Sequence, residues 1–151
     1  MIVWRITKRK YALDRIGLGA MKVGGRWNSI DVPIIYAGTN VEIAALEKLV
    51  HISDELPDDL VLTSISLPDD ANLYRENPIS TLPKGWSDMP SSIDAQQFGN
   101  DFIAAGQYLG IIVPSAIIPE GRNMLINPNH PQFKHAEFAV VRDFKYDVRL
   151  K

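Results

Sequence analysis

Three side chains with complementary chemistry fall within one short stretch of this sequence. Arg26 follows two glycines, Tyr36 ends an apolar run, and Glu47 lies among apolar residues of an expected helix. A guanidinium binds a phosphate or carboxylate through two parallel hydrogen bonds, an aromatic ring offers a flat surface, and a carboxylate stabilises a cation or binds sugar hydroxyls. The stretch therefore indicates a ligand site. The alternative is structural: an Arg26–Glu47 ion pair, with Tyr36 at the edge of the core and its hydroxyl outward.

The position of Glu47 depends on the helix that carries it. We expect this helix from Val41 to about Ser53, with Thr39 and Glu42 forming a capping box at its start. Its apolar stripe comprises Ile43, Leu46 and Val50, and Glu47 occupies the remaining position of that stripe. Burial of a charge is costly unless the charge is paired. Glu47 is therefore expected either to have a partner or to act chemically.

Composition excludes several classes of protein. The 151 residues are 46% hydrophobic and 23% charged, which suits one globular domain, expected to span 1–151. There is no cysteine, so disulfides, thiolate metal sites and cysteine nucleophiles are excluded. The three histidines lack metal-site spacing, and no P-loop or Gly-x-Ser-x-Gly motif is present, so we expect no metal. No run is long and apolar enough for a membrane helix, and the polar N-terminus does not fit a signal peptide, so we expect a cytoplasmic protein without membrane contact.

Charge is distributed unevenly along the chain. Residues 1–30 contain seven Lys or Arg and a single acid, Asp14, giving this segment a net charge of +6, whereas the remainder carries −8. A basic segment suggests an anionic partner, such as a phosphate-bearing ligand, a nucleic acid or an acidic protein. Attraction between the two oppositely charged parts of the chain is an equally open interpretation.

The expected elements indicate an α+β fold with a curved, mostly antiparallel, split β-core and flanking helices. A second helix is expected from about Ile93 to Leu109, capped by Ser91 with Asp94 and stopped by Gly110, with Phe98, Phe102, Ala105 and Leu109 inward. Strands are expected at 2–6, 33–37, 61–67, 111–113, 116–118 and 123–126, and a hairpin at 136–144 and 146–150. Residues 7–25 and 68–92 are expected to be long loops.

A series of short blocks, in order along nearly the whole chain, resembles the RES-domain family. They are Trp4-Arg5, Gly24-Gly25-Arg26-Trp27-Asn28-Ser29, Pro33-Ile34-Ile35-Tyr36, Ala44-Ala45-Leu46-Glu47-Lys48-Leu49-Val50-His51, Leu82-Pro83-Lys84-Gly85-Trp86, Val113-Pro114-Ser115 and Asn127-Pro128-Asn129-His130-Pro131. Each block is weak alone, but seven in order are specific. Phe102 departs from the family, in which a tryptophan is expected, and this change keeps an aromatic core residue.

The resemblance implies a toxin of a bacterial RES–Xre toxin–antitoxin pair with a fold like that of ADP-ribosyltransferases. Such a toxin consumes NAD as its substrate by hydrolysis or phosphorolysis of the nicotinamide–ribose bond, which depletes cellular NAD and arrests growth until a cognate Xre-type antitoxin neutralises it. The antitoxin would carry the DNA-binding helix-turn-helix, so no DNA binding is expected from this chain, and a homo-oligomer within the complex is left open.

The family's functional residues correspond to five positions of this sequence: Arg5, Arg26, Tyr36, Glu47 and Ser115. The resemblance implies that Glu47, Arg26 and Tyr36 are catalytic and that Arg5, Arg26, Tyr36 and Ser115 bind NAD. In this hypothesis the arginines hold phosphates, Tyr36 stacks on nicotinamide, Glu47 stabilises the charge on the ribose, and Ser115 fixes the ribose or carboxamide. One alternative is a protein ADP-ribosyltransferase that uses the same site. An RNA-binding or RNA-cleaving toxin is less favoured, because the basic segment is short and has few interleaved aromatic residues.

Overall fold

Seven strands form one sheet in the computed structural model, which describes residues 1–150. The strands are β1 (Ile2–Lys8), β2 (Ile35–Gly38), β3 (Leu60–Ser66), β4 (Tyr74–Glu76), β5 (Gly110–Pro114), β6 (Arg122–Ile126) and β7 (Glu137–Asp143). Their order is β4-β5-β6-β2-β1-β3-β7, and only the β4–β5 pair is parallel among these strands. The expected α+β class with a mostly antiparallel sheet is confirmed.

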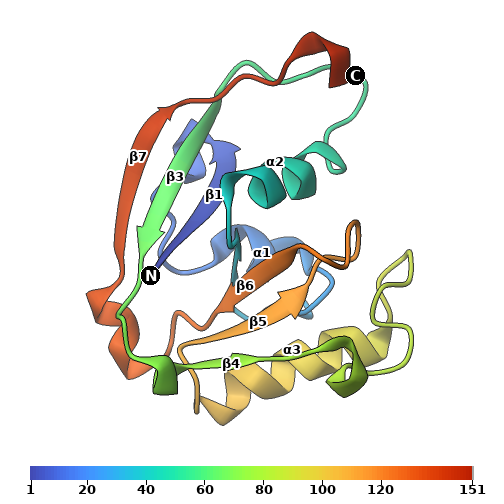
Figure 1. The fold of residues 1–151 in the computed structure, drawn as a ribbon, viewed down its shortest axis with the longest axis vertical. Coiled ribbons are helices and arrows are strands. Elements are labelled where there is room, and N and C mark those ends of the chain that lie inside the picture. The colour runs from blue at the N-terminus through green and yellow to red at the C-terminus, as the bar shows by residue number, and fades with distance from the viewer. Residues whose placement is uncertain (151) are drawn as a thin grey trace.

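The sheet divides into two arms between β1 and β2. These two strands share a single paired position, Trp4 with Gly38, whereas β1 pairs with β3 along its whole length. In Figure 1 the arm of β1, β3 and β7 runs steeply, and the arm that contains β4, β5 and β6 crosses below it. The sheet is therefore strongly curved, and the two arms diverge from the Trp4–Gly38 junction.

Both faces of β1 are covered by protein. Val3 packs in a cluster with Ile65 and Phe133, whereas Ile6 packs on the opposite face in a cluster with Ala44 and Tyr146. Residues three apart on a strand point to opposite faces, so an apolar residue is needed on each side. The first strand is consequently part of two hydrophobic clusters, and it is a central strand of the sheet.

Helix α2 (Val41–Leu49) packs against β1, β2 and β6, in the angle between the two arms (Figure 1). Its N-cap is Asn40, whose side chain accepts a hydrogen bond from the Ile43 N–H, so the expected Thr39 cap is wrong. The Thr39 hydroxyl instead donates to the Arg122 carbonyl. The helix also ends earlier than the expected Ser53.

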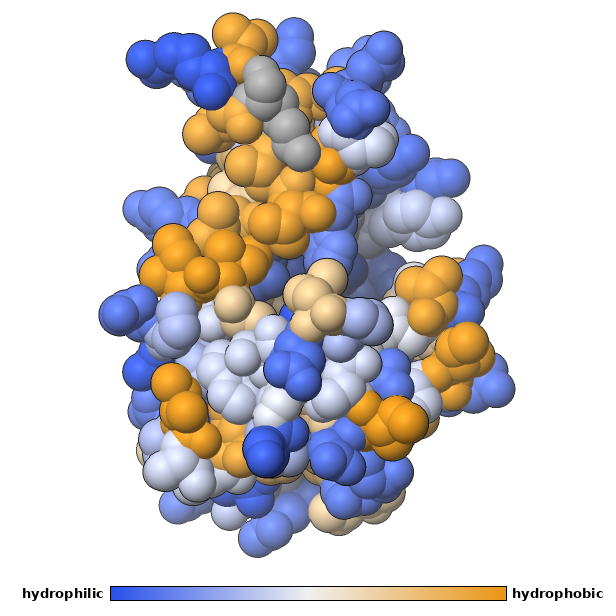
Figure 2. All heavy atoms as spheres, turned by 90° about the vertical axis from the view of Figure 1, so that its right-hand side faces the viewer, coloured by the Kyte–Doolittle hydropathy of each residue, from blue (hydrophilic) through white to orange (hydrophobic). Residues whose placement is uncertain are grey.

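The expected inward position of Val50 is wrong as well, because its side chain is 54% exposed. The C-terminal segment is similarly exposed, with Val148 at 79% and Leu150 at 55%. Figure 2 shows the face that lies on the right-hand side in Figure 1. Hydrophobic side chains gather over the upper half of this face. Contiguous exposed apolar surface of this kind often marks a contact site for another molecule.

Helix α3 (Ile93–Ala105) covers the β4–β5–β6 arm (Figure 1). Ser92 is its N-cap, one residue after the expected Ser91, and Gly106 ends it in a left-handed conformation with φ of 61°. The helix therefore stops before the expected Leu109 and Gly110. Its buried residues are Ala95, Gly99 and Phe102, whereas the expected inward residue Ala105 is exposed.

Four other expectations about the elements are wrong. Residues 7–25 contain the short helix α1 (Leu18–Val23), and the loop expected at 68–92 contains β4, an edge strand of three residues. Residues 116–118 form a turn, because the Ser115 hydroxyl accepts hydrogen bonds from the Ile117 and Ile118 N–H groups. The C-terminal hairpin is absent: β7 pairs with β3, and residues 148–150 form a 3₁₀ turn.

Candidate functional site

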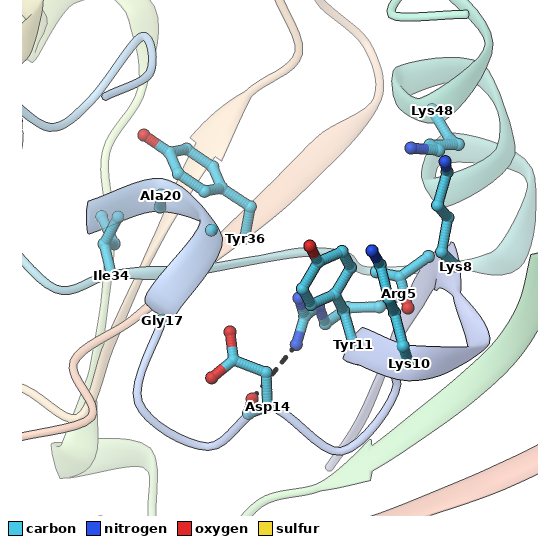
Figure 3. Close-up of a pocket in the computed structure, with 12 residues that line it drawn as sticks. Arg5, Lys8, Lys10, Tyr11, Asp14, Gly17, Ala20, Ile34, Tyr36 and Lys48 are labelled. Atoms are coloured by element: carbon cyan, nitrogen blue, oxygen red, sulfur yellow. Dashed lines mark hydrogen bonds between the residues drawn. The ribbon is translucent and has the colours of Figure 1, made fainter. Parts of the chain in front are cut away.

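A pocket opens where β1 and β2 diverge, with a volume of about 350 Å³. Its lining residues are Arg5, Thr7, Lys8, Lys10, Tyr11, Asp14, Gly17, Gly19, Ala20, Ile34, Tyr36 and Lys48. They come from β1 and the residues that follow it, from α1, from β2 and the residue before it, and from α2 (Figure 3). Two of the residues expected from the sequence, Arg5 and Tyr36, therefore line the same pocket.

Arg5 has N–H groups in this pocket that are not used in hydrogen bonds within residues 1–150. Among the described residues, its guanidinium makes one long hydrogen bond, 3.4 Å to the backbone carbonyl of Asp14 (Figure 3). The Asp14 carboxylate itself accepts from the backbone N–H groups of Ile16 and Leu18. Burial lowers the pKa of Arg5, and the negative charge of Asp14 opposes that shift. A guanidinium offers five N–H donors, so most of those of Arg5 are available to an anion.

Three lysines add positive charge to the same pocket. The Lys8 and Lys48 side chains point toward each other across its rim, and Lys10 lies beside them (Figure 3). Burial lowers the pKa of Lys48, the charge of Lys8 lowers it further, and Asp59 opposes both. The basic N-terminal segment indicated Lys8 and Lys10 only collectively, and no sequence signal singled out Lys48. The pocket therefore favours an anionic ligand.

Tyr36 presents its ring to the pocket and its hydroxyl to the protein. The hydroxyl donates to Asn28 Oδ1 at 2.6 Å and accepts from the Trp27 N–H at 3.0 Å. Burial raises the pKa of the Tyr36 phenol, whereas the hydrogen bond from Trp27 and the charge of Arg26 oppose the increase. The structural alternative predicted that the Tyr36 hydroxyl faces outward. That prediction is wrong, because the hydroxyl is hydrogen-bonded to the 25–28 loop.

Glu47 is partly buried and has two hydrogen-bond donors. The Ser115 hydroxyl donates to Glu47 Oε1 at 2.8 Å, and the Asn123 amide donates to the same oxygen at 2.6 Å. Ser115 is fully buried at the end of β5, and Asn123 lies on the neighbouring strand β6. The two expected residues Glu47 and Ser115 are therefore in direct contact. Asn123 was missed, because only the β5–β6 pairing places it beside Ser115.

Arg26 is separate from Glu47. Its Nη1 donates to the backbone carbonyls of Trp86 and Asp88, and its Nη2 contacts the sulfur of Met89. No ion pair joins Arg26 to Glu47 in the described chain, so the structural pair considered as an alternative is not formed. Arg26 remains close enough to Tyr36 for its charge to act on the phenol. Its guanidinium anchors the 86–89 segment beside the loop that Tyr36 holds.

The two groups of residues adjoin through α2. Lys48 lines the basic pocket and Glu47 belongs to the Ser115–Asn123 cluster. The two residues are consecutive on α2, so their side chains leave the helix in different directions, and Glu47 itself does not line the pocket. The helix therefore joins the Glu47 cluster to the pocket through adjacent backbone positions. Figure 2 shows a recess lined with hydrophilic residues at mid-height on this side of the molecule. Arranged in this way, the residues can bind an anionic group at one end of a ligand and stabilise positive charge at the other.

Within residues 1–150, no three or more His, Asp or Glu side chains gather in a way that could hold a metal ion. None of the helices within the same residues has the length and apolar character to cross a bilayer.

Comparison with known proteins identifies the family of this chain. The RES domain matches residues 2–149. The chain belongs to the RES-domain family. A relative named Toxin Res from Photorhabdus laumondii is 38% identical, over 99% of this chain and 97% of its own. Another Toxin Res, from Pseudomonas putida, is 39% identical over 99% of both chains.

One further relative and one solved structure are also similar to this chain. A Sphingobium protein named Prs ADP-ribosylating toxin is 38% identical to this RES-domain chain, over 97% of it and 94% of the relative. A crystal structure of the MbcT–MbcA toxin–antitoxin complex from M. tuberculosis contains a chain with a TM-score of 0.66 and 18% identity. That match covers 93% of this chain and 83% of the other, and it supports the shared fold.

Proposed function

We propose that this chain is the toxin of a toxin–antitoxin pair and that it cleaves the nicotinamide–ribose bond of NAD. The observation that carries this proposal is a hydrogen-bonded glutamate, Glu47, one residue before Lys48, which lines a pocket with an excess of cations. A dinucleotide carries a diphosphate at its centre and a positively charged nicotinamide ring at one end. The arrangement of basic pocket and carboxylate suits these two charges.

In the proposed reaction the C1–N bond of the nicotinamide ribose breaks, and its electron pair leaves with nicotinamide, which becomes neutral. The ribose then resembles an oxocarbenium ion, as in glycoside cleavage. Glu47 stabilises that positive charge, and Arg5 holds the diphosphate together with the lysines of the pocket. The ring of Tyr36 flanks the nicotinamide. In this proposal Arg26 contributes to the site in two ways: its positive charge lies near Tyr36, and its guanidinium anchors the 86–89 segment.

The nucleophile that completes the reaction is water or phosphate in our proposal. Water yields ADP-ribose and a proton, whereas phosphate yields a phosphorylated ADP-ribose. The second candidate is transfer of ADP-ribose to a side chain of another protein, which the name of the Sphingobium relative favours. The site residues are the same in both cases, because the nucleophile enters after the same bond breaks.

The proposed toxin is neutralised by an antitoxin of the Xre type. The solved structure with the related fold is a toxin–antitoxin complex. The exposed hydrophobic side chains on the face in Figure 2 offer such a partner a contact surface.

Nicotinamide release by the purified protein tests the proposal. NAD is supplied alone, with phosphate, or with a cell lysate and labelled NAD to detect a modified protein. Glu47→Gln should reduce the rate about 10²- to 10³-fold, because one preorganised electrostatic partner of the transition state is lost. Glu42→Gln is the matched control: it removes a charge from the same helix at an exposed position and should keep the rate. Full nicotinamide release by Glu47→Gln would refute the proposed mechanism, and label incorporation that requires lysate would favour the second candidate.

A further inference from the structure

Both donors of the Glu47 cluster reach a single carboxylate oxygen. The Asn123 Nδ2 atom and the Ser115 Oγ atom lie 2.6 and 2.8 Å from Glu47 Oε1. No hydrogen bond or ion pair from any described residue, 1–150, reaches Glu47 Oε2. One oxygen is therefore bound to the protein, and the other keeps its lone pairs for a ligand.

The Ser115 hydroxyl has no capacity left for a ligand. Ser115 is fully buried, and its oxygen accepts hydrogen bonds from the Ile117 and Ile118 N–H groups. A hydroxyl has one proton and two acceptor lone pairs, so the proton is committed to Glu47 and both lone pairs are used. Ser115 therefore acts on a ligand through Glu47, in contrast to the direct contact with ribose or carboxamide that the resemblance implied.

Asn123 is held equally firmly. Its backbone is paired on one side with Gly38 of β2 and on the other with Val113 of β5. The side chain of a residue in a central strand projects from a fixed backbone, and an amide NH₂ can donate to a carboxylate without adding charge. Asn123 thus brings a neutral, preorganised donor to Glu47 from the sheet, while Ser115 brings a second donor from the loop.

We propose that Asn123 is a positioning residue, which together with Ser115 fixes Glu47 Oε1 so that Oε2 alone faces the substrate. This inference rests on the proposed function of Glu47. A glutamate side chain has several rotatable bonds, and two hydrogen bonds to one oxygen select a single orientation of the carboxylate. The consequence is catalytic, because a displacement of about 1 Å at a reacting group costs about a hundredfold in rate.

Two substitutions test the role of Asn123. Asn123→Ala removes the donor, and Asn123→Asp keeps the shape of the side chain but places a second carboxylate beside Glu47. Both should lower kcat for nicotinamide release about tenfold to a hundredfold with little change in KM, because substrate binding by the basic pocket is untouched. The control is Asn77→Ala, which removes a buried amide that donates to the backbone carbonyl of Arg75 in the edge strand β4. It should keep kcat, with a melting temperature similar to that of Asn123→Ala.

A double-mutant cycle separates positioning from a general structural effect. In the Glu47→Gln background, Asn123→Ala should produce no further loss of kcat, because Asn123 acts only through Glu47. An equal loss of kcat in both backgrounds would overturn the inference, as would wild-type kcat in both Asn123 variants.

The growth of cells that express the chain distinguishes failure of this inference from failure of the proposed function. If the wild-type protein released no nicotinamide, the proposed function would fail. The effect of each substitution on growth arrest would then show whether Asn123 still acts through Glu47. Loss of arrest in Glu47→Gln and both Asn123 variants, with arrest kept in Asn77→Ala, would support the positioning role. Full arrest by the Asn123 variants, with none by Glu47→Gln, would overturn it.

Discussion

Replacement of Tyr36 by phenylalanine separates the role of its ring from the role of its hydroxyl. The ring lines the basic pocket, whereas the hydroxyl joins two groups of the 25–28 loop: it donates to Asn28 Oδ1 and accepts from the Trp27 N–H. Asn28 is itself fully buried. Tyr36→Phe keeps the ring but leaves both groups without this partner.

The expected loss of stability follows from the two bonds. Each hydrogen bond contributes about 0.5–1.5 kcal/mol to the free energy of unfolding, so Tyr36→Phe should lower that free energy by about 1–3 kcal/mol. For a chain of this size, 1 kcal/mol corresponds to about 2–4 °C, so a loss near the middle of the range lowers Tm by about 4–8 °C. The rate of the folded fraction should change much less than in Glu47→Gln, because the ring that flanks the substrate is retained.

Thermal and urea unfolding measure this loss, and nicotinamide release at a temperature well below both Tm values measures the activity. The matched control is Tyr11→Phe, the same chemical change at a pocket residue that is 40% exposed and whose hydroxyl makes no hydrogen bond within residues 1–150. Its free energy of unfolding should stay within about 0.5 kcal/mol of the wild type. Equal stability of Tyr36→Phe and Tyr11→Phe would refute the assigned role of the Tyr36 hydroxyl.

Two further predictions concern stability. Gly99→Ala should lower the free energy of unfolding by about 1–3 kcal/mol in urea titrations, because a Cβ at Gly99 would lie 1.7 Å from the backbone oxygen of Trp27. In Gly19→Ala the added Cβ meets nothing within 4 Å, so this substitution in helix α1 should instead raise the free energy of unfolding by up to about 1 kcal/mol. Burial raises the pKa of Tyr36 and raises that of Tyr146 to about 12, so the folded chain keeps protons that the unfolded chain releases near pH 10. The contribution of these phenols to stability should therefore be constant below about pH 10 and fall as the pH rises above it, and Tyr36→Phe should flatten that fall. The same pH profile above pH 10 in Tyr36→Phe and wild type would contradict the assignment.

Local signals in the sequence identified most strands and two of the three α-helices within residues 1–150, and they indicated Glu47 as a candidate site residue. Periodicity and capping chemistry act over a few residues, so they predicted the helix that carries Glu47 and the α+β class. They placed the caps one residue away from Asn40 and Ser92, because neighbouring side chains with similar capping ability compete and the backbone conformation decides between them. The family resemblance indicated the five site residues, and it could not say which of them are in contact.

Only the tertiary structure decided how those residues are grouped. The structural alternative paired Glu47 with Arg26, which is close in sequence. The hydrogen-bond partners of Glu47 are instead two neutral donors far along the chain, Asn123 on β6 and Ser115 in the loop after β5. Lys48 joins Arg5 because α2 packs across the junction of β1 and β2, an arrangement that no local pattern encodes. The sequence by itself determined which chemical groups are available. The long-range pairing of strands determined which groups face one another, because register and packing fix the direction of each side chain.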